Sequence, residues 1–220
     1  MIKTEILKLS ANNQDKPLLN RAAEMINRGG VIAFPTETVY ALGADATNGR
    51  AVQKIFQLKK RISGKPVAIF LPKLQDLQRF VKEITPSASK LIKEFWPGPL
   101  TLIFKSGSGQ MTHLSGDERK LGIRVSSSKF VQLLLIETRT PLTATSANLA
   151  GKPEPVSAEQ VLSYFDGKID LVINGGRSES ATPSSVVDVS EGIPILLREG
   201  RISYEKLRKI VPELKRKNKK

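Results

Sequence analysis

The hydrophobic residues of the chain are grouped in short runs, and several of these runs alternate with polar residues. Runs of about four to eight residues bounded by Gly, Pro, Asn or Ser are typical of β-strands. The pattern predicts strands at Thr4–Leu9, Val31–Phe34, Val67–Leu71, Leu100–Lys105, Gly122–Val125, Leu142–Thr145, Leu171–Ile173, Val186–Val189 and Ile193–Leu197.

Segments with helical spacing separate these runs. Leu18, Ala22 and Ile26 share one face of a segment that stops at the pair Gly29-Gly30, a typical helix end. Another segment starts at Ser157 and has Gln160 three residues later, which fits a capping box. The spacing predicts helices at Pro17–Arg28, Gly49–Lys60, Ser87–Phe95, Ser126–Ile136, Ser157–Phe165 and Tyr204–Ile210.

Predicted strands and helices alternate along the chain without a change to linker-like composition. This order favours one α/β domain built on a large twisted sheet, mostly mixed or antiparallel, with flanking helices. We expect the domain to cover residues 1–210 and a basic tail to follow at residues 211–220. The glycine-containing stretch Ser106–Arg119 is expected to be a mobile loop.

The composition excludes several kinds of chemistry. The chain has 220 residues, no cysteine and one histidine, so thiol catalysis, disulfides and thiolate or multi-histidine metal sites are excluded. We interpret His113 as a solvated loop residue rather than a catalytic base. No signal-peptide core and no apolar run of about 18 residues is present, so we expect a cytoplasmic protein with no membrane partner.

The net charge of +14 predicts an attraction to phosphates, either on a nucleotide or on a nucleic-acid backbone. The segment Arg198–Lys220 holds ten Lys and Arg residues against three Glu residues, so it supplies about half of the excess. For the terminal "KRKNKK" a solubilising tail explains the charge equally well.

Polar residues follow the predicted strand in "GGVIAFPTETVYALG". Thr36, Glu37 and Thr38 lie just past the carboxyl end of this strand, where open α/β sheets place their ligand crevice. The alternative is a turn whose hydroxyls bond to their own backbone. Three hydrogen-bonding side chains between two apolar runs favour the site.

Four cations, Lys59, Lys60, Arg61 and Lys65, gather where the second predicted helix ends in "LKKRISGKP". Such a group can neutralise a phosphate chain during nucleotidyl transfer, although a solvated helix end also attracts cations. The stretch does not match the glycine-rich P-loop motif.

Two further strand ends carry polar groups. Arg124 lies inside the short apolar strand of "GIRVSS", so it should face an internal carboxylate or a bound anion, and it could clamp a ligand carboxylate bidentately. Ser146 and Asn148 in "TATSANLAG" are two residues apart, so an extended chain presents both to one ligand. An Asx-type turn explains this second segment equally well.

Ser184 precedes the predicted strand Val186–Val189, and Arg198 follows the last predicted strand. Hydroxyl, amide and guanidinium groups therefore occur at or near the ends of several separate predicted strands. Their convergence would make one binding site, which is stronger evidence than any single segment.

Taken together, these segments resemble the YrdC family of threonylcarbamoyl-AMP synthases. The similarity runs in order through "TEILKLS", "GGVIAFPTETVYALGADA", "KKR", "WPGPLTLIF", "GIRV", "TSAN", "SSVVDV" and "ILLREG". The resemblance implies a single YrdC-like domain with a basic concave crevice. Because the sequence stops soon after "ILLREG", we expect the short, single-domain type.

The resemblance implies a nucleotidyl transfer in which L-threonine, bicarbonate and ATP give L-threonylcarbamoyladenylate, pyrophosphate and water, without a protein nucleophile. Magnesium is expected with ATP. The product would serve the threonylcarbamoyladenosine modification of tRNA through a downstream threonylcarbamoyl transferase complex.

The resemblance also implies roles for individual residues. The family's Lys-x-Arg and Ser-x-Asn motifs match Lys59, Arg61, Ser146 and Asn148. ATP binding is thereby assigned to Lys59, Arg61, Lys65, Ser146, Asn148 and Arg198. The binding of L-threonine or bicarbonate is assigned to Thr36, Thr38, Arg124 and Ser184.

Two alternatives remain open. A non-catalytic module of the same fold could bind tRNA or double-stranded RNA on a basic face, as the charge of +14 suggests. A carbamoyl-handling domain like that of hydrogenase-maturation proteins is the other, although those domains belong to much longer chains. The presence of Ser146 and Asn148 favours the synthase.

Overall fold

The structure is a computed structural model that describes residues 3–10, 15–60, 67–107, 111, 114 and 119–217. Its helices are α1 (Lys16–Asn27), α2 (Gly49–Leu58), the 3-10 helix η1 (Leu74–Arg79), α3 (Pro86–Phe95), α5 (Lys129–Thr138), α6 (Ala158–Phe165) and α7 (Tyr204–Ile210). Its strands are β1 (Glu5–Lys8), β2 (Ile32–Phe34), β3 (Ala41–Gly43), β4 (Ile69–Phe70), β5 (Leu100–Lys105), β6 (Lys120–Arg124), β7 (Leu142–Thr143), β8 (Thr145–Ser146), β9 (Leu171–Asn174), β10 (Ser185–Asp188), β11 (Ile195–Arg198) and β12 (Lys215–Arg216).

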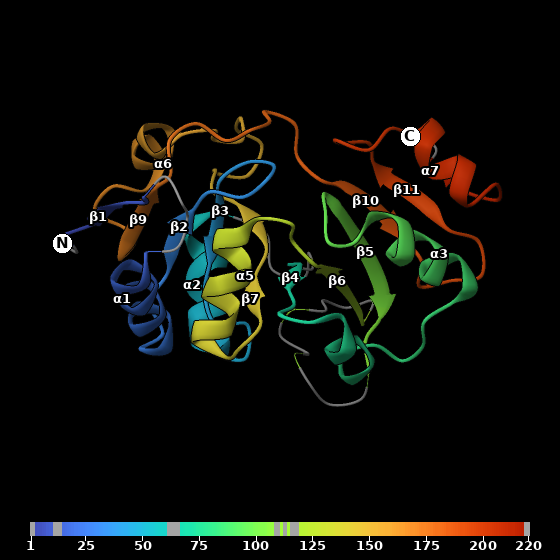
Figure 1. Ribbon diagram of the computed structural model, residues 1–220, viewed down its shortest axis with the longest axis horizontal. Coiled ribbons are helices and arrows are strands. Elements are labelled where there is room, and N and C mark those ends of the chain that lie inside the picture. Colours follow the sequence, from blue (N-terminus) through green and yellow to red (C-terminus); the bar gives the residue numbers. More distant parts are fainter. Residues whose placement is uncertain are drawn as a thin grey trace.

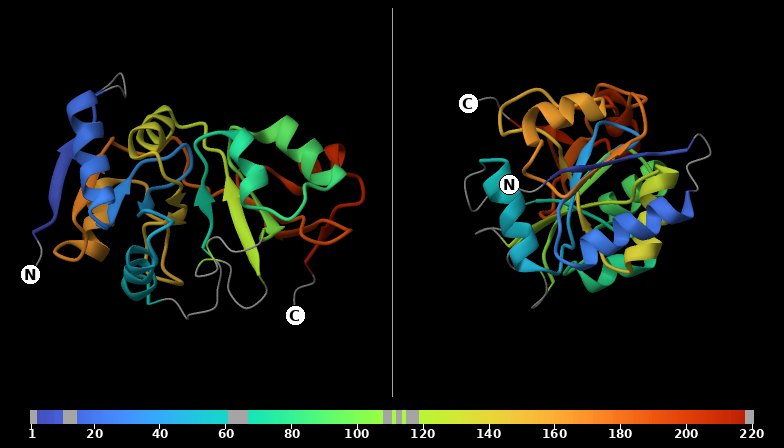
Figure 2. Two further views of the ribbon diagram at one scale, coloured as in Figure 1. Left: turned by 90° about the horizontal axis from the view of Figure 1, so that it is seen from below. Right: turned by 90° about the vertical axis from the view of Figure 1, so that its left-hand side faces the viewer.

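The strands form two mixed sheets that lie side by side along the longest axis of the molecule (Figure 1 and Figure 2). The first sheet has the order β1-β9-β2-β3-β8, and the second has the order β12-β11-β10-β5-β6-β4-β7. The predicted α/β fold with mixed sheets and flanking helices is confirmed, but its strands are divided between two sheets instead of one.

A single short segment belongs to both sheets. β7 pairs with β4 of the second sheet, and β8, which begins two residues after β7 ends, pairs with β3 of the first. The backbone N–H of Thr143 donates to Ala44 and that of Ala144 donates to Ala68, so neighbouring residues bond to opposite halves. The single strand predicted at Leu142–Thr145 is therefore two strands, and this segment joins the two halves.

In the half of the molecule that is built on the first sheet, successive side chains of a strand pack alternately into two different cores. Ile32 and Phe34 of β2 pack in one core with α1 and α5, whereas Val31 and Ala33 pack in the other with α2 and α6. The helices accordingly cover both faces of the first sheet (Figure 2). A strand buried on both faces reads as a continuous apolar run, as "VIAF" does.

In the second half, helices α3 and α7 cover only one face of the sheet (Figure 1). Leu100, Leu102 and Phe104 of β5 point into this core. Thr101 and Ile103, which alternate with them, line a cavity on the opposite face. The second sheet therefore supplies both a core and the floor of a potential site.

Most predicted elements are found within a few residues of their expected bounds. The sequence pattern did not reveal β3 and β12, which are too short to carry a periodic signal. Helix α5 begins at Lys129 with Ser128 as its cap, later than the predicted start at Ser126, because the Ser126 hydroxyl bonds to Glu37 instead.

The last described residues pack against the second sheet. Val211 and Leu214 are buried in its core, and β12 pairs with β11. Within the described part of the chain, none of the helices is both long and apolar enough to cross a membrane. Arg61, Lys65, His113 and most of the loop expected at Ser106–Arg119 lie outside the described residues.

Candidate active site

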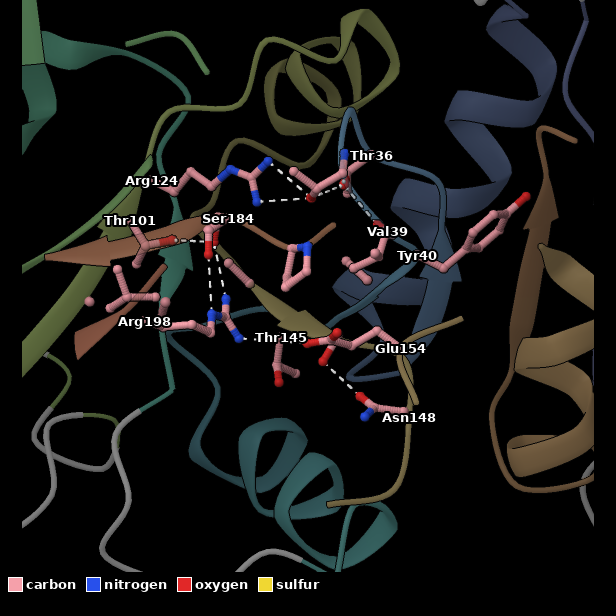
Figure 3. A pocket seen from close by; sticks show the side chains of 18 of the residues that line it. Thr36, Val39, Tyr40, Thr101, Arg124, Thr145, Asn148, Glu154, Ser184 and Arg198 are labelled. Carbon is pink, nitrogen blue, oxygen red and sulfur yellow. Dashed lines mark hydrogen bonds and ion pairs between the residues drawn. The ribbon is translucent and has the colours of Figure 1, made fainter. Parts of the chain in front are cut away.

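A cavity of about 600 Å³ lies between the two halves, with the second sheet as its floor (Figure 3). Eight of the ten residues assigned to the site from the sequence line it, and the other two, Arg61 and Lys65, lie outside the described residues. The eight come from strand ends and turns of both halves. They are Thr36, Thr38, Lys59, Arg124, Ser146, Asn148, Ser184 and Arg198.

The hydroxyls of Thr36 and Thr38 form a closed hydrogen-bond arrangement. Thr36 Oγ1 donates to the Val39 carbonyl at 2.7 Å and accepts from the Thr38 backbone N–H at 3.1 Å. Since the Thr36 hydrogen is engaged, Thr38 Oγ1 must donate across the 2.9 Å that separates the two hydroxyls. Both predicted interpretations of this turn apply, because the hydroxyls bond to their own turn and also line the cavity.

Arg124 is buried and has partners on nearly all its donors. Its Nε donates to the Gly98 carbonyl, its Nη1 and Nη2 each lie 3.2 Å from Thr38 Oγ1, and Nη2 lies 2.9 Å from Glu37 Oε1. The predicted internal carboxylate is thus confirmed as Glu37. One of the five guanidinium hydrogens, on Nη1, has no partner among the described residues, so this arrangement does not offer a bidentate clamp.

Glu37 is the anchor of this arrangement. Its Oε2 accepts from the Ser126 hydroxyl at 2.5 Å and its Oε1 accepts from the Ser127 backbone at 2.9 Å. Burial alone would raise the pKa of Glu37, but the charge of Arg124 and these hydrogen bonds outweigh it and hold the pKa below its usual range. Arg201 also donates to the Glu37 carbonyl. Residues of β6, or following β6 and β11, in the second half therefore hold the turn of the first sheet.

Lys59, Ser146 and Asn148 lie together in the first half. The Lys59 Nζ donates to the carbonyls of Ser146 and Asn148 and lies 3.2 Å from Asn148 Oδ1. Ser146 Oγ donates to Asn148 Oδ1 at 2.6 Å, which confirms that the two side chains face the same side. The buried ammonium fixes the turn and leaves a positive charge beside the cavity.

Arg198 lies at the cavity mouth and is held more loosely. Its Nε donates to the Ser184 carbonyl at 3.1 Å and its Nη2 to Ser184 Oγ at 3.3 Å, while Nη1 lies 3.6 Å from Glu154. Burial lowers the pKa of Arg198, and Glu154 acts against this. A Cβ on Gly200 would lie 2.3 Å from the Pro183 carbonyl, so only glycine lets this chain segment approach Ser184.

Five described lining residues with polar side chains lie outside the sequence assignment: Tyr40, Lys60, Thr101, Thr145 and Glu154. Burial raises the pKa of Tyr40 to about 12, and its hydroxyl donates to the Gly176 carbonyl, so its role here is structural. Thr101 carried a usable signal, since it is the polar position between Leu100 and Leu102. Glu154 carried none, because "GKPEP" has the composition of an ordinary turn.

Within the described residues, no group of three or more His, Asp or Glu side chains is placed to hold a metal ion. Glu154 is the acidic residue among the described residues that line the cavity, against four cations. A metal entering this part of the cavity would therefore need ligands from a bound anion as well as from the protein.

Fold and cavity together define the class: an α/β protein with a polar, largely cationic cavity between two mixed sheets. Residues 24–200 match the protein family described as Sua5_yciO_yrdC, "Telomere recombination". The chain belongs to this family.

Two relatives are named threonylcarbamoyl-AMP synthase. The protein from Pyrococcus abyssi is 38% identical over 194 residues, which is 88% of this chain and 57% of the relative. The protein from Bacillus subtilis is 35% identical over 204 residues, 92% of this chain and 58% of the relative. The chain thus spans somewhat less than three fifths of the length of these relatives.

Solved structures share the fold. P. abyssi Sua5 complexed with L-threonine has a TM-score of 0.90 at 34% identity, covering 97% of this chain and 62% of that one. YciO from E. coli has a TM-score of 0.83 at 27% identity, covering 94% of this chain and the whole of that one.

Proposed function

We propose that this chain is an L-threonylcarbamoyladenylate synthase that uses L-threonine, bicarbonate and ATP and releases pyrophosphate and water. The convergence of eight assigned residues on one cavity carries the proposal. Two synthases of this name are 35% and 38% identical to most of the chain. The product would serve tRNA threonylcarbamoyladenosine synthesis through a downstream transferase complex.

The cavity suits such a reaction in size and charge. Its volume of about 600 Å³ falls within the range of small-molecule sites, about 300–1,000 Å³. Lys59 and Arg198 would neutralise charge on the phosphates as pyrophosphate leaves, together with Arg61 of the sequence motif. Ser146 and Asn148 would bind the nucleotide beside Lys59.

The buried end of the cavity would hold the amino acid. A solved relative, P. abyssi Sua5, is described as complexed with L-threonine. Here Arg124 would orient the carbamate formed from the threonine amine and bicarbonate, so that a carbamate oxygen attacks the α-phosphorus. Binding and orientation account for the chemistry, and no side chain has to act as a nucleophile.

Magnesium would enter with ATP and would reduce the charge on its phosphates. Glu154 would be the protein carboxylate nearest to such an ion among the described lining residues. The 3.6 Å separation between Glu154 and Arg198 is long enough for Arg198 to exchange this contact for one to a phosphate.

The test is incubation of the purified protein with ATP, bicarbonate and labelled L-threonine, followed by measurement of pyrophosphate and adenylate. We expect turnover that needs all three substrates and that falls at least about 10-fold in Lys59→Ala, since a hydrogen-bonded charge is lost. Lys54→Ala is the matched control, because Lys54 lies on the same helix and bonds to the Gly29 carbonyl.

Absence of threonine- and bicarbonate-dependent turnover, combined with strong salt-sensitive binding of tRNA or double-stranded RNA, would replace the synthase with the RNA-binding module. Turnover equal to that of the unmodified protein in both Lys59→Ala and Arg61→Ala would overturn the assigned nucleotide site.

A further inference from the structure

Hydrogen bonding at the buried end of the cavity distinguishes groups held by the protein from groups open to a ligand. The hydroxyl hydrogens of Thr36 and Thr38 are both engaged within the turn, and Thr38 also accepts from Arg124. Arg124 keeps one N–H of its Nη1 without a partner among the described residues. These side chains position one another, so other groups at this end must supply most ligand contacts.

Thr101 and Ser184 form a second hydroxyl pair, and here the described residues of the protein do not use both hydroxyl hydrogens. Their oxygens lie 3.0 Å apart, and both residues are buried, with 6% and 5% of their surface exposed. The pair has two hydrogens, and only one can lie between the oxygens. The described residues offer no acceptor for the second hydrogen, so it is open to the cavity that both residues line.

The surroundings of this pair determine which ligand group it suits. Arg198 donates to Ser184, and Arg124 lies on the same side of the cavity (Figure 3). A hydroxyl donor beside two guanidinium groups favours an anionic oxygen. Lys60 and Arg198 are more exposed and face the mouth, where a triphosphate has room, whereas the buried pair suits a small carboxylate.

The sheet holds the pair in place. Thr101 on β5 pairs with Val186 on β10, and Val186 is the second residue after Ser184. Its neighbour on the floor is Gly122, where a Cβ would lie 2.9 Å from Ala68 and 3.6 Å from the Thr101 methyl. The floor is therefore bare backbone beside Thr101, and a ligand can reach the hydroxyl.

We infer that Thr101 and Ser184 together bind the carboxylate of the amino-acid substrate, which makes Thr101 a substrate-contacting residue. The inference rests on the proposed function and extends it to a residue that the motifs do not include. Either hydroxyl can turn its hydrogen toward the ligand, so each partly replaces the other.

The test measures L-threonine binding by calorimetry in Ser184→Ala and in the double variant Thr101→Val/Ser184→Ala. Ser184→Ala leaves the Thr101 hydroxyl to serve the ligand, so we expect the double variant to bind about 10-fold or more weakly than Ser184→Ala. Thr101→Ser in the Ser184→Ala background retains a hydroxyl and should restore the binding. Thr101→Val alone should cost less, because Ser184 remains.

Thr140→Val in the Ser184→Ala background is the matched control, since the Thr140 hydroxyl is buried without a partner and lies outside the cavity lining. L-Threonine amide, which lacks the carboxylate, should bind equally to Ser184→Ala and to the double variant. Thr101→Val should leave ATP affinity unchanged, and Ser184→Ala and the double variant should share the same ATP affinity, because both lack the Ser184 hydroxyl that bonds to Arg198. Thermal unfolding shows whether each variant is folded.

Equal L-threonine affinity in folded Ser184→Ala and the double variant would overturn the inference and leave the proposed function intact. A loss of ATP affinity caused by Thr101→Val would also overturn it, because the pair would then belong to the nucleotide. If the unmodified protein binds neither L-threonine nor ATP, the proposed function itself fails.

Discussion

Arg124 and Arg198 line the same cavity but are held in opposite ways. The side chain of Arg124 is 6% exposed and lies 2.9 Å from a carboxylate that is itself buried. The side chain of Arg198 is 46% exposed, and its nearest carboxylate is 3.6 Å away. A buried guanidinium needs a permanent partner, whereas a half-exposed one can exchange its partner for a ligand.

The comparison teaches that charge alone does not identify a ligand contact. Arg124 resembles an anion-binding residue in sequence, yet Glu37 and Thr38 already occupy most of its donors. Its main effect is to shape the closed end of the cavity. Arg198 has fewer internal partners, and its position at the mouth suits an incoming phosphate chain.

The largest expected effect is on stability. Glu37→Ala should lower the free energy of unfolding by about 3–5 kcal/mol, because it leaves the Arg124 charge buried without its partner. Glu154→Ala, the same change at the looser pair, should cost at most about 1 kcal/mol. Denaturant unfolding of both variants measures the difference, and equal losses would show that the two arginines are held alike.

A smaller effect is expected at the nucleotide. Arg198→Ala should weaken ATP binding about 10- to 100-fold, since a hydrogen bond to a charged group contributes about 1.5–3 kcal/mol. Its free energy of unfolding should change little. Arg177→Ala, which removes an exposed arginine outside the described cavity lining, is the control for the change in charge. Unchanged ATP affinity in Arg198→Ala would remove Arg198 from the site.

The smallest expected effect is a change in how the free energy of unfolding depends on pH in the acid range. The pKa of Glu37 is lower in the folded protein than its usual value. Ionised Glu37 therefore contributes fully to the free energy of unfolding above about pH 4.3, the pKa of an unperturbed Glu. The contribution is lost as the pH falls through the lowered pKa. Glu37→Gln should therefore show a shallower loss of stability below that pH. An identical slope would mean that the pair does not control this titration.

The parts of the structure that depend on local pattern could be predicted from the sequence. The strand Leu100–Lys105 is found with its predicted bounds because a short apolar run between Pro99 and the glycine-containing stretch after Lys105 is a strong signal. Ser146 and Asn148 were expected on one side of the chain from their spacing alone, and they hydrogen-bond to each other. Lys59 joins them through a helix end that the spacing also indicated.

Features that depend on distant partners could not be predicted. Glu37 bonds to Ser126, 89 residues further along the chain, and nothing in either segment specifies the other. The division into two sheets depends on how Leu142–Ser146 pairs with β3 and β4, which periodicity does not encode. Glu154 reaches the cavity through a turn of unremarkable composition.

The crossing at Leu142–Ser146 also limits how the cavity can change its width. A strand advances about 3.3 Å per residue, so Leu142–Ser146 is a short, extended connection between the two sheets that border the cavity. Drawing them apart would break the pairing of β7 with β4 or of β8 with β3. This connection therefore confines changes in cavity shape to the mouth, where the side chains of Arg198 and Glu154 can change conformation. The second sheet, which forms the floor, keeps its shape.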